Sequence, residues 1–265
     1  MARYDFREPR LFVEAPLVPG ARVALEAPQQ HYLEHVLRQK PGDRVLAFNG
    51  RDGEWRTVLA EAGKRTLALV AEACTRPQPA PGDLLYLFAP LKRARLDYMV
   101  QKAVEMGASG LAPVTTRHTQ AERVNGARMR ANAIEAAEQC GILTLPDIYE
   151  PAPLAAAVGA LEADRRLIFC DEDAPVADPL AALAAVRDAV RDSARNEAGP
   201  GAGVPLAVPL AVLIGPEGGF SEDERAMLIA RPGVIRLALG PRILRADTAA
   251  VAALAVVQAV LGDWR

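Results

Sequence analysis

The sequence predicts an α/β protein with two parts: a small N-terminal β-barrel and a larger C-terminal domain built on a mostly parallel sheet. Up to residue 75, short runs rich in apolar and β-branched residues follow one another, separated by turn signals. From residue 84 onward, strand-like runs alternate with helical patterns. Between the two parts, residues 76–83 (RPQPAPGD) contain three prolines and a glycine, which is the composition of a linker. We therefore expect domains at 1–75 and 84–265.

The N-terminal part is predicted to be a barrel with one helix. Its expected strands cover residues 10–14, 21–27, 43–49, 54–62 and 66–73. The dipeptides Asn49-Gly50 and Asp52-Gly53 are strong signals for a hairpin turn. Residues 29–38 (QQHYLEHVLR) form the expected helix, on which His31, His35 and Arg38 share one face.

The C-terminal part is predicted to alternate strands and helices. The strands are expected at 84–90, 111–114, 165–170, 210–214 and 233–239, and the helices at 95–107, within 124–141, at 179–194, at 222–230 and from about 243 to 261. Residues 195–209 are rich in glycine and proline and predict a loop. Its GPGAG run has no strand directly before it, so it is not interpreted as a dinucleotide motif.

Composition places the chain among ordinary globular proteins, with 51% hydrophobic and 24% charged residues among 265. The first ten residues are charged, and the most apolar stretch, 249–261, is shorter than the roughly 20 residues that span a bilayer. We expect a cytoplasmic protein without a membrane segment. Cys74, Cys140 and Cys170 are scattered and predict buried, reduced thiols, and three histidines suggest no metal site.

The charge distribution is weakly compatible with RNA. The formal net charge is −2, which by itself argues against a nucleic-acid partner. Residues 1–80 carry 12 Lys and Arg against 10 Asp and Glu, whereas residues 151–265 carry 11 against 15. A slightly basic front end on an acidic body allows local RNA contact.

The stretch LIGPEGGFSEDE, residues 213–224, carries the first chemical signal. A buried strand ends at Gly215-Pro216, and Ser221 with Glu224 makes a capping box at the start of a helix. Strand, glycine turn and helix start are the geometry that holds phosphates. However, no lysine follows the glycines, Glu217 places a negative charge in the turn, and neither phosphate motif matches.

A second glycine turn, Gly240-Pro241, follows the strand at 233–239, and both turns open on the same side of a parallel sheet. Glu217 suits a cationic or hydrogen-bond-donating ligand, and apolar side chains are available to flank a flat heterocycle: Ile214, Leu239, Ile243 and Leu244. A planar base with a positive centre and no phosphate fits such a site. S-adenosylmethionine is one such ligand.

IGPEGGFSEDE followed by LGPRILRADTA closely resembles the C-terminal signature of the RsmE family, the 16S rRNA uracil-N3 methyltransferases of the SPOUT superfamily. The resemblance covers most of the chain. It extends to HYLEHVLRQKPGD (31–43), LKRARLDYMVQKAVEMG (91–107), TTRHT (115–119) and IEAAEQCG (134–141). It implies a PUA-like RNA-binding barrel, a C-terminal deep trefoil knot, a homodimer with its active site near the subunit interface, and 16S rRNA in the assembled small subunit as substrate.

The resemblance also implies roles for individual residues. Those expected to bind S-adenosylmethionine are Ile214, Gly215, Pro216, Glu217, Gly218, Gly219, Leu239, Gly240, Ile243, Leu244, Arg245 and Thr248. The glycines would let the backbone approach the cofactor. Arg245 is the candidate for stabilising the uracil anion or a phosphate, Asp247 for orienting it or acting as base, and Glu217 is a third candidate. Candidates for RNA contact are His31, His35, Arg38, Lys40, Lys92, Arg93 and Arg117.

The chain departs from the family pattern at two points. Ile142 stands where the family commonly has arginine after EQCG, which would remove a cation from an RNA-facing or active-site surface. The family's R-T-E-T-A reads R-A-D-T-A here, so the acid at Asp247 is one methylene shorter. Alternatives are an RNA-binding protein that has lost catalysis, a nucleotide-dependent α/β enzyme, and methylation of a ribose 2′-oxygen or of tRNA.

Overall fold

The computed structural model describes residues 8–63, 66–120, 123–176, 178–198 and 209–264, with side chains described up to residue 190 in the helix that ends at 198. The chain divides into two compact units. The first contains the residues up to Pro81 together with Ile134–Leu145, and the second contains Gly82–Ala133 and the residues from Pro146 onward. The exchange of residues 134–145 into the first unit has no signal in the sequence pattern.

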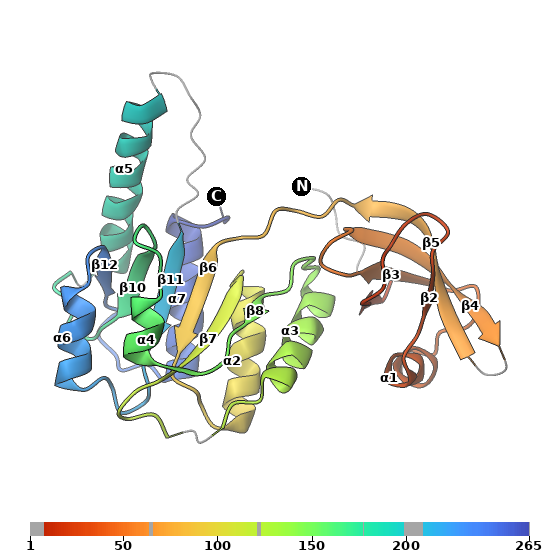
Figure 1. Cartoon of the computed structure of the whole chain (residues 1–265), viewed down its shortest axis with the longest axis horizontal. Coiled ribbons are helices and arrows are strands. Elements are labelled where there is room, and N and C mark those ends of the chain that lie inside the picture. Colours follow the sequence, from red (N-terminus) through yellow and green to blue (C-terminus); the bar gives the residue numbers. More distant parts are fainter. Residues whose placement is uncertain (1–7, 64–65, 121–122, 177, 199–208, 265) are drawn as a thin grey trace. The chain divides into compact units, whose positions relative to one another are not determined.

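The first unit is a five-stranded sheet with strand order β1-β3-β4-β5-β2 (Figure 1). β1 pairs parallel with β3, and the other pairs are antiparallel. The strands are β1 Arg10–Phe12, β2 Arg22–Ala24, β3 Arg44–Phe48, β4 Glu54–Gly63 and β5 Thr66–Arg76. All five expected strands are confirmed. In the turn between β3 and β4, buried Asn49 accepts hydrogen bonds from the amides of Arg51 and Asp52, at 3.0 and 2.9 Å.

The expected helix at 29–38 is confirmed in a shorter form. It consists of α1, Ala27–His31, and a π-helical turn, η1, Tyr32–Val36. Gln39 N donates to Leu33 O at 2.8 Å, which closes the helix end around Arg38 at φ 56°. Arg38 is therefore in the left-handed region, which costs most residues about 1–2 kcal/mol. It lies past the helix and not on the helical face of His31 and His35.

The second half of α3, Gly126–Cys140, is anchored inside the first unit by two arginines. The guanidinium of Arg10 donates to the carbonyls of Ala137, Glu138 and Ile142, and Arg76 donates to Gly141 O at 2.9 Å. Ala137 and Glu138 are in the last turn of α3, where a helix leaves main-chain carbonyls without intrahelical partners, and Gly141 and Ile142 directly follow it. The two arginines thus cap α3.

Both capping arginines are paired with Glu54, which is 4% exposed. Its carboxylate lies 2.9 Å from Arg10 Nε and 2.6 Å from Arg76 Nη2. Burial by itself raises the pKa of Glu54, but the hydrogen bonds from Arg76 and Arg10 outweigh burial and hold the pKa below its ordinary value. Glu54 is therefore a buried, paired carboxylate.

Ile142 packs against an apolar cluster of the first unit that contains Phe12, Phe48, Ala137 and Leu143. The interpretation that Ile142 removes a cation from an RNA-facing or active-site surface finds no support in this position. The side chain fills apolar space, and its carbonyl is one of those capped by Arg10, at 3.0 Å.

The second unit is a parallel sheet with strand order β12-β10-β11-β6-β7-β8, with β9 paired to β7. Its strands are β6 Leu84–Phe88, β7 Gly110–Thr115, β8 Asp147–Ile148, β9 Ala152–Pro153, β10 Arg166–Cys170, β11 Leu210–Ile214 and β12 Val234–Leu237. The five longer strands confirm the predicted ones. β8, β9 and the short helix α4, Leu154–Gly159, were not expected because they are too short for a periodic pattern.

Helices cover both faces of this sheet (Figure 1). α4 and α6, Glu222–Ala230, pack on one face over Leu87, Phe169 and Leu213. α2, Arg93–Glu105, and α7, Ala246–Val260, pack together on the other. α5, Pro179–Ala198, also contacts α7. Residues 195–198 of the expected loop are thus helical, and the GPGAG run lies outside the described residues. The last helix begins at Ala246, three residues later than expected.

No helix in the described ranges is long and apolar enough to cross a membrane. The prediction of three buried thiols is wrong, since Cys74 and Cys140 are exposed. Cys170 is half-buried at the end of β10, and burial raises its pKa to about 12, so it is a protonated thiol at neutral pH.

Candidate functional site

The two glycine loops lie at one edge of the parallel sheet, as expected. They follow β11 and β12, which pair with β10 from opposite sides. Two strand spacings separate them, about 10 Å. Ligands of open parallel sheets bind beyond the carboxyl ends of the strands, so the edge formed by these loops is the candidate cofactor site.

Asp171 directly follows β10, the strand that lies between β11 and β12. Its side chain is 4% exposed and lies 3.1 Å from Arg225 Nη2 of α6 and 2.7 Å from Arg236 Nε of β12. Burial raises the pKa of Asp171, but hydrogen bonds from Arg236, Arg225 and the Asp173 amide outweigh burial and keep it below the ordinary value. Sequence reasoning missed this cluster, whose only signal is an acid at a strand end.

The first loop is braced by the residues that follow β7. The predicted capping box is confirmed: Glu224 N donates to Ser221 Oγ at 3.3 Å, and Ser221 N donates to Glu224 at 2.9 Å. The same carboxylate accepts from Arg117 N at 2.8 Å, and His118 Nδ1 lies 3.1 Å from Gly219 O. The TTRHT segment therefore supports the glycine turn.

The glycines of the first loop are required by the protein itself. A Cβ on Gly215 would lie 2.5 Å from the ring of Phe220, and one on Gly218 would lie 3.3 Å from His118 Cβ. Gly219 has φ 71°, which a side chain would strain. These contacts explain the glycines independently of any ligand. A Cβ on Gly219 itself would project into open space.

The second loop has main-chain groups that remain available for a ligand. Residues 239–244 make no main-chain hydrogen bond to any other described residue. Gly240 has φ 90°, a Cβ added to it would meet no atom within 4 Å, and Ile243 is 97% exposed. Free amides and carbonyls beside an exposed apolar side chain suit a flat heterocycle with polar edges.

The remaining candidates of this loop lie at the start of α7. Arg245 is the N-cap residue and is exposed, as is Thr248, whose amide donates to Asp247 Oδ1 at 2.9 Å. Asp247 is in the first turn of the helix, where a carboxylate is favoured by the helix dipole. Its position at the N-terminus of α7 and its hydrogen bond with the Thr248 amide are therefore consistent with a purely structural role for Asp247.

Arg95, in the first turn of α2, connects the two loops, and sequence reasoning missed it. Its Nη1 forms an ion pair with Glu217 Oε1 of the first loop. Its Nε lies 3.9 Å from Asp247 Oδ2, beyond the second loop. The only sequence signal was an arginine in a helix N-terminal turn that contains no acid.

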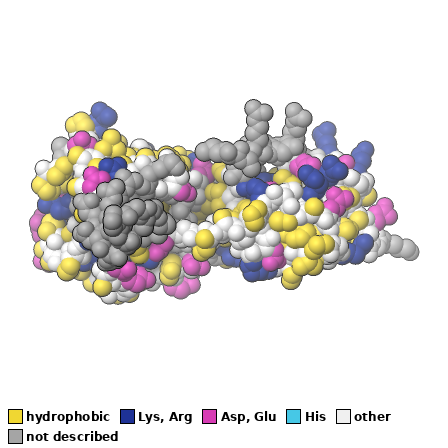
Figure 2. Space-filling view, turned by 90° about the horizontal axis from the view of Figure 1, so that it is seen from above, with side chains coloured by type: hydrophobic (Ala, Val, Ile, Leu, Met, Phe, Trp, Pro, Cys, Tyr) yellow, Lys and Arg dark blue, Asp and Glu magenta, His cyan; other side chains and the backbone are white. Residues whose placement is uncertain are grey.

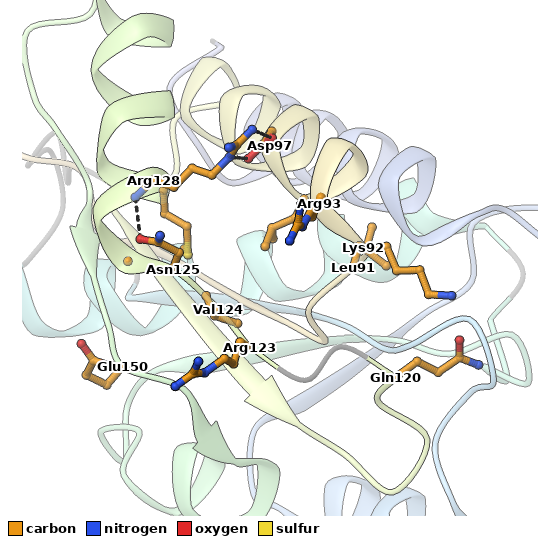
Figure 3. A pocket seen from close by; sticks show the side chains of 13 residues that line it. Leu91, Lys92, Arg93, Asp97, Gln120, Arg123, Val124, Asn125, Arg128 and Glu150 are labelled. Carbon is orange, nitrogen blue, oxygen red and sulfur yellow. Dashed lines mark hydrogen bonds and ion pairs between the residues drawn. The ribbon is translucent and has the colours of Figure 1, made fainter.

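Two cavities adjoin this site within the second unit. One of about 410 Å³ is lined by Lys92, Arg93, Arg95, His118 and Glu217 among others. One of about 1190 Å³ shares Lys92 and Arg93 with it (Figure 3). Figure 3 shows Lys92 with Gln120 at one end of the larger cavity and Arg128 with Asp97 at the other.

The larger cavity is mixed in charge. Arg128 Nη2 lies 2.6 Å from Asp97 Oδ2, and this hydrogen bond holds the pKa of Asp97 below its ordinary value. Arg123 and Glu150 also line it. The structure thus brings Lys92 and Arg93 together with the first loop, whereas Arg117 is exposed beside that loop.

The other RNA candidates lie in the first unit and are exposed: His31, His35, Arg38 and Lys40. The rings of His31 and His35 are 4.7 Å apart and nearly perpendicular. Basic and acidic side chains are interspersed over the face seen in Figure 2.

No group of three or more His, Cys, Asp or Glu side chains within the described part of the chain is arranged to hold a metal ion.

Comparisons with known proteins agree with this architecture. Residues 78–258 match a family model described as an RNA methyltransferase domain, and residues 25–72 match one described as an RNA methyltransferase PUA domain. The ribosomal RNA small subunit methyltransferase E of Rickettsia conorii is 26% identical over 251 residues, 94% of each chain. The protein of the same name from Synechocystis is 29% identical and covers 95% of this chain and 78% of its own.

Solved structures show the same two-part fold. A Legionella pneumophila protein in complex with the cofactor SAM has a TM-score of 0.76 at 25% identity, over 96% of this chain and 98% of its own. The ribosomal RNA small subunit methyltransferase E of Neisseria gonorrhoeae, bound to S-adenosyl methionine, has a TM-score of 0.78 at 24% identity, over 98% of this chain and all of its own.

Proposed function

The chain belongs to the RNA methyltransferase family, and from that membership we propose that it methylates N3 of one uridine in 16S rRNA with S-adenosylmethionine as donor. The observation that carries the proposal is the pair of loops after β11 and β12. One presents Glu217, and the other presents free main-chain groups and the exposed Ile243. The relatives that cover nearly the whole chain are named as small-subunit rRNA methyltransferases.

S-adenosylmethionine, when bound, supplies a methyl group that its sulfonium makes reactive. The protein's part is to align this donor with the acceptor. We assign the adenosine part to the loop at Leu239, Gly240, Ile243 and Leu244. We assign the cationic part to the side of Glu217, with the first loop completed by Ile214, Gly215, Pro216, Gly218 and Gly219 and the second by Arg245 and Thr248.

The acceptor requires the loss of a proton, because N3 of uracil is a good nucleophile only without it. Glu217 and Asp247 remain candidates for the base, and Arg245 remains the candidate for stabilising the developing anion. The structure adds His118. A carbonyl oxygen only accepts hydrogen bonds, so the contact with Gly219 O assigns a proton to Nδ1. In the neutral form of the ring, Nε2 is then the nitrogen that accepts a proton.

The 410 Å³ cavity is the proposed entry for the target nucleotide. Its size is that of a small-ligand site, and it joins basic side chains of α2 to His118 and Glu217 of the first loop. We propose that Lys92, Arg93 and Arg117 contact RNA phosphates beside it. His31, His35, Arg38 and Lys40 would make further contacts from the PUA-like unit, where residues 25–72 match the PUA model.

We also propose that the substrate is the assembled small ribosomal subunit and that the protein acts in the cytoplasm. We propose further that the active form is a homodimer and that the C-terminal loops form a trefoil knot. The alternative of a catalytically inactive RNA-binding protein was based on Ile142 in place of the family's arginine. It is no longer favoured, because packing in an apolar cluster accounts for Ile142.

Calorimetry with S-adenosylmethionine tests the cofactor assignment, with Ile243→Ser as the variant. Since Ile243 is almost fully exposed, its replacement leaves stability unchanged, and we expect affinity to fall about tenfold, as for the loss of one apolar contact of about 1.4 kcal/mol. Ile229→Ser is the matched control, because Ile229 is an exposed isoleucine on α6. Equal affinity of all three proteins would contradict the placement of the adenosine.

A further inference from the structure

We propose that Arg95 is a positioning residue for the methyl-transfer site: it ties the first cofactor loop to the start of α7, directly after the second loop, by neutralising Glu217 and Asp247 at once. The inference rests on the proposed function. The contacts of Arg95 are with Glu217 and Asp247, and the proposed role acts through these two carboxylates.

The first support is geometric. β10 lies between β11 and β12, so the loops that follow β11 and β12 are not neighbours in the sheet. Arg95 belongs to neither loop, yet its guanidinium pairs with Glu217 and lies 3.9 Å from Asp247. The planar guanidinium carries five N–H donors in a fork, which lets one side chain serve two carboxylates.

The second support is electrostatic. Without Arg95, Glu217 of the first loop and Asp247 of α7 would lose the cation that lies between them. Asp247 already has its other oxygen occupied by the Thr248 amide, so its position is fixed by α7. Glu217 is about half exposed in an irregular turn. Repulsion would therefore move the first loop, because that loop is the less constrained side.

The third support is local. An arginine in the first turn of a helix opposes the helix dipole, and no acid in that turn of α2 compensates it. Arg95 thus does nothing for the stability of its own helix. A residue that is unfavourable for its own helix in this way is expected to have a role in contacts with other parts of the fold.

Arg95 also connects the cofactor loops to the proposed RNA contacts. Lys92, the N-cap residue of α2, and Arg93 lie within one turn of Arg95, and all three line the 410 Å³ cavity with Glu217. RNA bound at Lys92 and Arg93 would therefore contact the same turn of α2 that carries Arg95.

The test is calorimetry with S-adenosylmethionine on the full chain. We expect Arg95→Ala to weaken binding at least tenfold and Arg95→Lys to give an intermediate loss, since an ammonium replaces the charge but not the fork. Arg187→Ala is the matched control. Arg187 is on α5, is 31% exposed against 34% for Arg95, and also pairs with an acid, Asp188. Thermal unfolding without cofactor verifies that each variant is folded.

Two further measurements distinguish the loss of the Arg95 contacts with Glu217 and Asp247 from a general structural defect. Repulsion between partly exposed carboxylates is screened by salt, so raising the salt from about 0.05 to about 0.5 M should recover part of the affinity of Arg95→Ala beyond any change in the wild type. Adding Asp247→Asn to Arg95→Ala should also recover affinity. Affinity of Arg95→Ala within twofold of the wild type would overturn the inference, and so would the absence of both recoveries. A wild-type protein that does not bind S-adenosylmethionine would instead refute the proposed function.

Discussion

His118 Nδ1 lies 3.1 Å from the carbonyl oxygen of Gly219, and this contact orients an exposed histidine beside the loop that follows β11. The ring lines the 410 Å³ cavity, and in its neutral form with Nδ1 protonated the other nitrogen is an acceptor. The charged groups around it are Glu224 of α6, Glu217 of the loop, and Lys92, Arg93 and Arg95 of α2. A neutral imidazole in this place is able to take the N3 proton of uracil.

Replacing His118 with glutamine should therefore abolish methyl transfer and leave cofactor binding intact. The side-chain amide of glutamine keeps a donor for Gly219 O but offers no base. We expect kcat to fall by about 100-fold or more, within the usual range for a general base, with the affinity for S-adenosylmethionine within twofold. Retention of wild-type kcat would leave Glu217 and Asp247 as the candidates.

Variants at Arg38 distinguish an effect on RNA binding from an effect on the free energy of unfolding. Its φ of 56° costs about 1–2 kcal/mol, whereas glycine adopts this conformation freely at an extra unfolded-state entropy of about 0.5–1 kcal/mol. We expect Arg38→Gly to leave the free energy of unfolding unchanged or raise it by up to about 1 kcal/mol, and Arg38→Ala to bring no such gain.

Both Arg38 variants should weaken binding to small-subunit RNA to the same extent and reduce the salt dependence by about one phosphate contact. Filter binding at several salt concentrations measures this. RNA affinity equal to that of the wild type would remove Arg38 from the RNA surface and leave its strained backbone unexplained.

Glu54 should make the first unit sensitive to acid. Its pKa is lower in the folded protein than in the unfolded chain, so its contribution is fully present above the unfolded value of about 4.3 and is lost as pH falls through the folded value. Glu54→Gln should lower the free energy of unfolding at neutral pH by about 3–5 kcal/mol, because Arg10 and Arg76 would both lose the buried carboxylate that they contact. Denaturant unfolding at pH 7 and below pH 4 should show this difference shrinking in acid. An equal loss at both pH values would contradict the ionised pairing.

Ile142 tests whether the departure from the family pattern matters for function or for packing. Introducing the family's residue, Ile142→Arg, should destabilise the protein by about 1–3 kcal/mol without raising methyl transfer, because a larger, charged side chain would enter an apolar cluster. Ile142→Val, the control that keeps the site apolar, should cost about 0.5–1.5 kcal/mol. A gain in methyl transfer or in RNA affinity for Ile142→Arg would restore the original interpretation of this position.

The sequence predicted the order of elements because that order follows from periodicity and turn chemistry. The runs at 84–88, 166–170 and 210–214 are continuous and apolar, as strands buried on both faces are, and Gly107 with φ 82° ends α2 as a helix-terminal glycine does. The capping box at Ser221 and Glu224 was readable from spacing alone.

What the sequence did not predict depends on contacts between distant segments. Arg10 and Arg76 meet Glu54 and the end of α3 only after folding, and Arg95 meets Glu217 across 122 residues of chain. His118 became a candidate for the base only because the fold places its Nδ1 beside the carbonyl oxygen of Gly219. Arginine, histidine and carboxylate side chains are common on surfaces, and no local pattern distinguishes those that the fold brings together.

The most direct test of the account is analysis of the nucleosides of 16S rRNA after incubation of unmodified small ribosomal subunits with this protein and S-adenosylmethionine labelled in its methyl group. The account predicts about one labelled methyl group per subunit, recovered as N3-methyluridine by mass spectrometry. Label in any other nucleoside would contradict the proposed position, and the absence of label in the presence of bound cofactor would contradict methylation of this substrate.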